Sequence, residues 1–204
     1  MKGTEYVVLC MQAALRKLRE TMDPVVRLPE AEWQLWSAIW EPYTAKRKTV
    51  ITPVGAPERY LYFVLEGAQR VFYSDADGHE ATLVFTFPGS FGGVLDAMLD
   101  KNPSRYTYET LSASTIIRAR YTDIEMLAQT NPGISAFIQV SLTAALSGLL
   151  HRLAELQSFS SEEKFRALLS RSPQILQHVP HKYLANYLGI DPTNFSKLMN
   201  RKVF

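Results

Sequence analysis

The chain has 204 residues, 47% of them hydrophobic and 21% charged, and a formal net charge of +2. This composition is typical of a folded globular protein and excludes a disordered or fibrous chain. The single cysteine, Cys10, excludes an intrachain disulfide and a four-cysteine iron–sulfur cluster, and we expect it to be a buried thiol. The apolar run at residues 6–11 is too short to span a membrane, so we expect a cytoplasmic protein with no membrane partner.

Residues from about 13 to 40 have the composition of helices. Leu15, Leu18 and Met22 recur at helical spacing, and residues 23–24 break the pattern. Pro29 then opens a second helical stretch, because proline is well tolerated in the first turn of a helix. The tryptophans of this region are expected to cover a hydrophobic core: Trp33, Trp36 and Trp40.

Residues from about 43 to 120 form short apolar stretches separated by turn signals, a pattern typical of an all-β unit. Residues 69–74 and 80–87 flank the pair Asp77-Gly78. Because Asp-Gly readily adopts the positive-φ turn that suits twisted strands, this segment predicts a β-hairpin. Strands at such regular intervals predict a barrel or a roll.

Residues 132–158 are predicted to form one long helix. Leucines step along it by four, three, four and three residues, the spacing by which one helix packs lengthwise on another: Leu142, Leu146, Leu149, Leu153 and Leu156. Two interpretations stay open, an amphipathic helix lying on the β unit and the interface of a homodimer. Gly148 indicates a closely approaching neighbour, since glycine costs about 1 kcal/mol of helix propensity relative to alanine. We expect the dimer.

The last part of the chain predicts a helix-turn-helix. Six apolar residues have the spacing of its core: Leu184, Ala185, Leu188, Ile190, Phe195 and Leu198. Gly189 breaks the first helix at a turn where positive φ is cheap. Asp191 is the expected N-cap of the second helix, and Pro192 its first residue. The alternative is an ordinary helical hairpin with a polar outer face.

The outward face of the second helix carries polar and basic side chains of the kinds that read base edges and phosphates. Residues 160–204 hold seven lysines and arginines against three acids, a net charge of +4, whereas the rest of the chain is at −2. A basic end of this kind indicates a nucleic-acid-binding module. We expect DNA contacts from Lys182, Thr193, Asn194, Ser196, Lys197, Asn200, Arg201 and Lys202.

Three further stretches carry a family resemblance: residues 62–67 (Tyr-Phe-Val-Leu-Glu-Gly), residues 75–79 and residues 88–93 (Pro-Gly-Ser-Phe-Gly-Gly). With the helix-turn-helix and the order of elements, they make nearly the whole chain resemble the Crp/Fnr family of bacterial transcription regulators. The resemblance implies an α+β fold, with N-terminal helices, a β-roll like a double-stranded jelly roll, a long helix and a helix-turn-helix. It implies a cyclic-nucleotide-binding-like sensor domain at residues 1–130, a dimerisation helix at 131–158 and a DNA-binding domain at 159–204.

In that family the Pro-Gly-x-Phe-Gly stretch leads into a phosphate-binding cassette. Such a cassette needs glycines that let backbone N–H groups approach phosphate, an acid for the ribose and an arginine for the phosphate charge. Gly93 stands where the family's nucleotide binders carry a glutamate, and Tyr106 replaces a small residue beside the candidate arginine. We therefore expect no cofactor and no response to cyclic AMP, and leave another small-molecule effector open. Its candidate contacts are Phe91, Gly92, Gly93, Arg105 and Tyr106.

The preferred function is a homodimeric, DNA-binding transcription regulator. The alternative is a ligand-binding signalling protein whose C-terminal helices contact a protein partner. Two features favour the alternative: the modest positive charge, and an end at Phe204 without the β wing that commonly follows the recognition helix in the family. We expect no enzyme, because the sequence holds no nucleophile elbow, phosphate-loop lysine or dinucleotide fingerprint. We expect no metal site, because His151, His178 and His181 are scattered without partner ligands.

Overall fold

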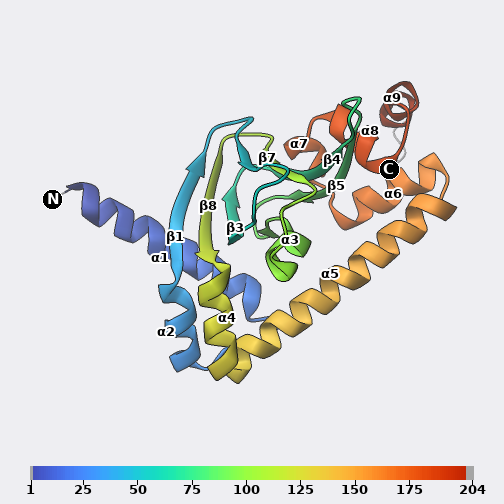
Figure 1. Ribbon diagram of the computed structural model, residues 1–204. Helices are drawn as coiled ribbons and strands as arrows, with labels where there is room; N and C mark the ends of the chain where they lie inside the picture. The colour runs from blue at the N-terminus through green and yellow to red at the C-terminus, as the bar shows by residue number, and fades with distance from the viewer. Residues whose placement is uncertain (1, 201–204) are drawn as a thin grey trace.

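The computed structural model describes residues 2–200, with side chains from residue 10 onward. Figure 1 shows two N-terminal helices beside a β-roll, a long helix that runs past the roll, and a group of C-terminal helices at its far end. The helices before the long one are α1 (Lys2–Met22), α2 (Glu30–Ala38), α3 (Leu95–Asp100) and α4 (Tyr121–Thr130). The long helix and those after it are α5 (Pro132–Ser158), α6 (Ser161–Arg171), α7 (Ile175–His178), α8 (His181–Leu188) and α9 (Pro192–Asn200).

The roll consists of two four-stranded antiparallel sheets, which confirms the predicted α+β fold with a β-roll. One sheet has the order β1 (Trp40–Ala45), β8 (Ser114–Arg120), β3 (Tyr60–Glu66) and β6 (Phe91–Gly92). The other has the order β2 (Val50–Thr52), β7 (Thr107–Thr110), β4 (Gln69–Ser74) and β5 (Glu80–Thr86). Strands β4 and β5 form the predicted hairpin, with Gly78 at φ +83° in the turn.

The N-terminal helices and one face of the first sheet share a hydrophobic core. Trp36 has no exposed surface, and its ring lies 5.8 Å from Trp40 and 6.0 Å from Phe137 of α5. The predicted role of the three tryptophans is therefore confirmed. Two details were wrong, since α1 extends to residue 2 and Trp40 opens strand β1. Cys10 is also exposed, contrary to expectation, because it lies on the outer side of α1.

The interior of the roll is filled by its own side chains. Tyr62 and Tyr108 are at most 3% exposed, and their rings lie 5.4 Å apart. Val71, Val94 and Ile116 complete this cluster with Ala97 of α3. Because aromatic side chains of this size bury large areas, the space between the sheets is a packed core.

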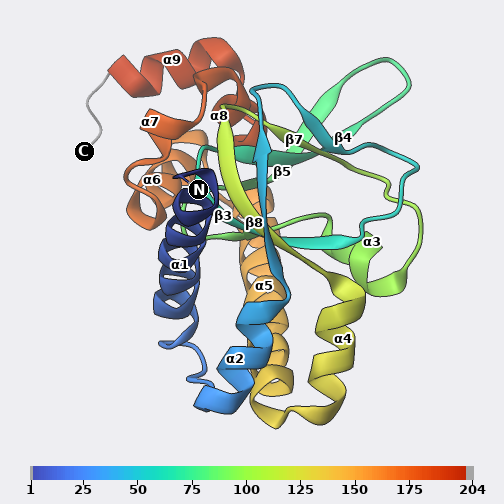
Figure 2. The same cartoon turned by 90° about the vertical axis from the view of Figure 1, so that its left-hand side faces the viewer.

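Helix α5 has three parts with different surroundings. Its first turns are anchored by Ile134 and Phe137 in the N-terminal core. Its last turns hold buried Arg152 and Glu155 against the C-terminal helices. Between these ends the helix is largely uncovered, and Figure 2 shows it linking the end of the molecule with α2 and α4 to the end with α6–α9.

The C-terminal helices enclose a third core that also contains residues of the roll. The six apolar residues of the predicted helix-turn-helix core are all at most 5% exposed, which confirms that prediction: Leu184, Ala185, Leu188, Ile190, Phe195 and Leu198. Ala68, Phe85 and Leu111 of the roll belong to the same cluster. Helix α6 begins with a reciprocal capping box, in which the Ser160 hydroxyl accepts from the Glu163 backbone and the Glu163 carboxylate from the Ser160 backbone.

Candidate nucleic-acid interface and effector site

Helices α8 and α9 form a tight pair, called here the C-terminal helix pair. Gly189 ends α8 at φ +61°, in the left-handed region that favours glycine. The Asp191 carboxylate accepts from the backbone N–H of Thr193 at 2.8 Å and of Asn194 at 3.2 Å. This carboxylate caps α9, which begins at Pro192 as predicted. The two helices are therefore held by both an apolar core and a defined cap.

The predicted DNA-contacting side chains within the described residues are exposed: those of α9 lie on its outward side, and Lys182 lies at the start of α8, with its ammonium 4.6 Å from the centre of the Tyr183 ring. The exposed residues are Lys182, Thr193, Asn194, Ser196, Lys197 and Asn200. The Ser196 hydroxyl is already engaged, because it donates to the Pro192 carbonyl at 2.9 Å within the same helix. Arg201 and Lys202 lie outside the described residues. The remaining donors and acceptors form a polar face without an acidic group after the cap.

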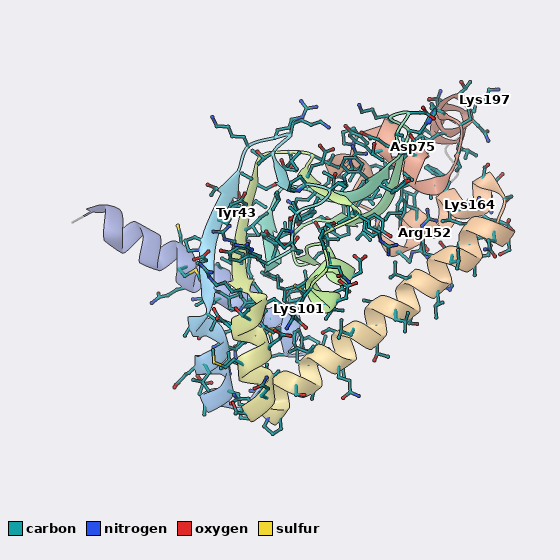
Figure 3. All side chains as sticks on the ribbon, in the orientation of Figure 1. Tyr43, Asp75, Lys101, Arg152, Lys164 and Lys197 are labelled. Carbon is teal, nitrogen blue, oxygen red and sulfur yellow. The ribbon has the colours of Figure 1, made fainter. Side chains whose placement is uncertain are left out.

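Basic side chains of α6 lie at the same end of the molecule. Figure 3 shows Lys164 of α6 and Lys197 of α9 at the end of the molecule that holds the C-terminal helices. Arg166 is partly neutralised, since its guanidinium pairs with Glu162 at 2.5 Å. The local positive charge therefore comes mainly from the lysines.

A buried ionic network lies where α8 meets the second sheet of the roll. Arg70 of β4 is 1% exposed, and it pairs with Glu109 at 2.7 Å and with Glu80 at 2.6 Å. Lys48 pairs with Glu109 at 3.2 Å and donates to the Tyr183 hydroxyl at 2.5 Å. A buried arginine with two carboxylate partners is satisfied, which is the condition for tolerating its charge there. No local sequence pattern indicates this network, because its members lie on separate segments.

The network shifts the ionisation of the tyrosine in α8. Burial would raise the pKa of the Tyr183 phenol. The hydrogen bonds from Lys48 and Lys182 and the charges of Lys48 and Arg70 outweigh burial, so this pKa lies below its ordinary value of 10.0. Tyr183 is therefore in a distinctly positive environment.

The predicted effector contacts Phe91, Gly92 and Gly93 lie in different surroundings. The Phe91 ring belongs to the N-terminal core, 5.2 Å from Phe63. Gly92 faces the roll interior, where an added Cβ would lie 2.5 Å from the Tyr108 hydroxyl. Gly93 has φ +121°, a conformation that favours glycine. These three consecutive residues do not converge on one open cavity.

The side chain of Arg105 is 78% exposed, and its nearest acid is Asp96, 3.9 Å away. Its neighbour Tyr106 is half-buried beside the roll core. The guanidinium lies 5.9 Å from the centre of the Tyr106 ring. In this structure the candidate phosphate partner therefore faces solvent, and the interior space is taken up by tyrosine rings.

A carboxylate from the roll itself lies beside the glycine loop. Glu58 is 6% exposed, and its Oε2 accepts from the Thr52 hydroxyl at 2.7 Å and from the Val94 backbone N–H at 3.2 Å. This oxygen lies 3.7 Å from where a Cβ on Gly93 would be. Burial raises the pKa of Glu58 above 4.5, although these hydrogen bonds favour the ionised form. An internal anion thus already uses a backbone donor of the loop.

A shallow cavity of about 150 Å³ opens at the edge of the roll. Arg118 forms part of its wall, with the guanidinium 4.6 Å from the Tyr43 ring and 4.2 Å from the Tyr60 ring. Arg118 also donates to Glu41 at 2.8 Å. Its arginine is held between two tyrosine rings and a carboxylate.

One group of side chains at the β4–β5 turn has ligand types that bind metals. The candidate atoms of Asp75, Asp77 and His79 lie within 4.8 Å of one another. The same Asp75 oxygen accepts from the backbone N–H groups of Asp77 and His79, so it shapes the turn. The group is surface-exposed in part or in full, and its geometry is explained by the hairpin.

The leucines of the predicted dimer interface are uncovered along α5. The side chains from Leu146 onward are substantially exposed, at 59% for Leu146, 51% for Leu149 and Leu153, and 38% for Leu156. Leu142 is half-buried. A Cβ on Gly148 would meet nothing within 4 Å in this chain. The leucine row therefore does not pack against the roll, which was the alternative interpretation of its spacing.

Helix α5 is also, by length and composition alone, apolar enough to cross a membrane. The most apolar stretch of 18 residues in this helix has a mean hydropathy of 1.6, and 11% of that stretch is buried. An exposed apolar surface of this extent is unusual in a monomeric globular protein.

Residues 44–131 match the family described as the cyclic nucleotide-binding domain. FixK2 from Bradyrhizobium japonicum is 15% identical, with a TM-score of 0.73 over 80% of this chain and 84% of that one. CLP, the c-di-GMP-responsive global regulator of Xanthomonas campestris, is 19% identical, with a TM-score of 0.65 over 85% of this chain and 91% of that one.

A protein from Eubacterium rectale assigned to the Crp/Fnr family of transcriptional regulators is 15% identical, with a TM-score of 0.63 over 85% of this chain and 83% of that one. No curated protein sequence matches the chain. Residues 44–131 are therefore similar to a cyclic nucleotide-binding domain, and the chain has the fold of Crp/Fnr regulators, which confirms the predicted resemblance.

Proposed function

We propose that this chain is a DNA-binding transcription regulator that acts as a homodimer and does not respond to cyclic AMP. The observation that carries the proposal is the exposed polar face of α9 on a rigid, capped helix pair. A helix presented in this way fits the major groove, where Thr193, Ser196, Lys197 and Asn200 would contact bases. Lys182, with Arg201 and Lys202, would hold phosphates.

The homodimer is supported by the uncovered leucine row of α5. Two parallel copies of the helix would cover each other's leucines, and a two-fold axis along α5 would present two copies of α9 to a palindromic site. A second copy covers this face better than lipid, because buried Arg152 and Glu155 lie on the same helix. We therefore propose a cytoplasmic protein, with a sensor domain at residues 1–130, a dimerisation helix at 131–158 and a DNA-binding domain at 159–204.

DNA binding is tested by titrating fluorescent duplexes selected from genomic fragments. Lys182→Ala with Lys197→Ala should weaken binding and lower the salt slope by about one unit, since Lys182 is the phosphate contact of the two and each lost phosphate contact removes about one unit. Lys17→Ala is the matched control, because Lys17 is an exposed lysine of α1. Unchanged affinity and slope in the double variant at low salt would contradict the assigned roles.

The insensitivity to cyclic AMP rests on three features of the roll. Gly93 provides no ribose carboxylate, Arg105 is exposed, and the rings of Tyr62 and Tyr108 fill the interior. Calorimetric titration with cyclic AMP, cyclic GMP and c-di-GMP should give no binding heat below millimolar ligand. A saturable heat with cyclic AMP at micromolar concentrations would overturn this part of the proposal.

The second candidate is a ligand-binding signalling protein whose C-terminal helices contact a protein. The cavity beside Arg118 and the modest net charge of +2 favour it. Salt dependence discriminates the two, because counterion release from DNA gives a steep slope and an apolar protein contact does not.

A further inference from the structure

Helix α8 lies against the outer edge of the second sheet. Strand β5 is the last strand of that sheet, so one row of its backbone groups has no strand partner. The side-chain amide of Asn186 forms hydrogen bonds to this row through both its oxygen and its nitrogen. Its Oδ1 accepts from the Thr82 backbone N–H at 2.6 Å, and its Nδ2 donates to the Glu80 carbonyl at 2.6 Å. The amide thus pairs with β5 as the backbone of a neighbouring strand would.

The second contact comes from Tyr183, one turn earlier on the same face of α8. Tyr183 is 5% exposed, and its ring lies 4.1 Å from the Arg70 guanidinium. Its hydroxyl accepts from Lys48 at 2.5 Å, and Glu109 pairs with both cations. Three segments that are distant in the sequence, those of Lys48, Arg70 and Glu109, therefore hold this tyrosine in place.

These contacts constrain the recognition surface as well as α8. Helix α9 packs on α8 through Phe195 and Leu198, and Asp191 fixes where α9 begins. Whatever holds α8 against the roll therefore sets the direction of α9. In a dimer built on α5, that direction sets the distance between the two recognition helices, which must match half-sites about 34 Å apart.

We propose that Tyr183 and Asn186 are positioning residues, which dock the C-terminal helix pair on the roll and so determine the half-site spacing that the dimer accepts. The proposal rests on the proposed DNA-binding function. Neither residue needs to touch DNA, since both act through the orientation of α9.

The docking of α8 on the roll through Tyr183 and Asn186 is tested first without DNA, by amide hydrogen exchange in the full chain. Asn186→Ala removes both hydrogen bonds, and Asn186→Asp keeps an acceptor for Thr82 but places a carboxylate oxygen beside the Glu80 carbonyl. In both variants the Thr82 amide should exchange at least about tenfold faster. Gln34→Ala, which removes an exposed amide from α2, should leave it unchanged. An unchanged exchange rate of the Thr82 amide in Asn186→Ala would contradict the proposed docking of α8 on β5.

The positioning role is tested on duplexes whose half-sites, selected from a random library by the unmodified protein, are separated by varied spacers. The unmodified protein should prefer one spacing by at least about tenfold, and Asn186→Ala should reduce this preference below about threefold. Affinity for a single half-site should stay within about twofold, because the face of α9 is intact. Tyr183→Phe and Lys48→Met each remove the hydrogen bond between Lys48 and the Tyr183 hydroxyl, so both should weaken the preference.

The outcomes separate the two proposals. Normal DNA binding with an unchanged spacing preference in Asn186→Ala and Lys48→Met would overturn the positioning role alone. If the unmodified protein binds no duplex, the proposed DNA-binding function is overturned, and the spacing role with it. Slow exchange of the Thr82 amide in the same protein would still show that α8 is docked on β5. A general loss of single-site affinity in Asn186→Ala would also contradict the proposal, since it would indicate direct contact with DNA.

Discussion

The leucine row of α5 leads to a quantitative prediction about assembly. Leu149 and Leu153 are each 51% exposed, so about half of each side chain remains to be covered by a partner. Burying a leucine completely contributes about 1.5–3 kcal/mol, and the uncovered half therefore contributes about 1 kcal/mol. Leu149→Ala with Leu153→Ala changes four side chains in a dimer, and should weaken association by about 4 kcal/mol. This corresponds to an increase of about 10³-fold in the dimer dissociation constant.

Sedimentation equilibrium measures this change directly. The monomer mass is 23.1 kDa, and the unmodified protein should sediment at twice that mass at micromolar concentration. The double variant should be monomeric there, with an unchanged helical circular dichroism signal, because shortening exposed leucines leaves no cavity in the folded monomer. Leu35→Ala is the matched control, since Leu35 is a 47% exposed leucine of α2.

Two results would refute the reasoning. One is a monomeric unmodified protein at concentrations up to about 100 μM, since an interface of this strength would hold there. The other is a double variant whose dissociation constant changes less than about threefold, which would mean that the dimer forms through another surface.

Three other predictions concern the folded chain. Gly92→Ala should lower the free energy of unfolding in urea by about 1–3 kcal/mol, because its Cβ would lie 2.5 Å from the buried Tyr108 hydroxyl, and Tyr108→Phe in the same chain should recover part of the loss. Arg171→Met should cost about 3 kcal/mol at neutral pH, because it leaves the buried Glu155 carboxylate without its main partner. The hydrogen bond from Arg171 holds the pKa of Glu155 below 4.5. The stability that this ion pair contributes is therefore present above pH 4.5 and is lost as the pH falls through the folded-state pKa of Glu155. In acid, the variant and the unmodified protein should have the same free energy of unfolding. Ultraviolet pH titration should show one tyrosine ionising before the others, and Tyr183→Phe should abolish that step, because the pKa of Tyr183 lies below 10.0.

The local features of the chain could be predicted because their determinants lie close together in the sequence. The apolar core of the C-terminal helix pair, its cap at Asp191 and the turn at Gly189 all depend on residues within a few positions of one another. The β4–β5 hairpin follows from Asp77-Gly78 in the same way. Helical periodicity also predicted a leucine row on α5, and its members from Leu146 onward are exposed in this chain.

The contacts between distant segments could not be predicted. Asn186 and Thr82 are 104 residues apart, and an amide on an amphipathic helix looks like an ordinary surface residue in the sequence. Arg70 and Glu109 occupy strands where charged residues usually face solvent, so their burial depends on mutual pairing across β4 and β7. The position of Arg105 likewise depends on how the rings of the roll interior pack, which no local pattern encodes.

The contact between α5 and α8 has a consequence for the short connection that joins the long helix to the helices after it. Arg152 donates to the Tyr187 carbonyl, and its guanidinium lies 3.9 Å from the Tyr187 ring (Arg152 is labelled in Figure 3). The covalent connection between α5 and α6 is only Phe159 and Ser160, yet the C-terminal helices are also held by noncovalent contacts on two sides. The two-residue connection and the contacts with α5 therefore orient the C-terminal helices together, so a residue inserted or removed at Phe159 or Ser160 would strain the pairing of Arg171 with Glu155 or the contact of Arg152 with Tyr187.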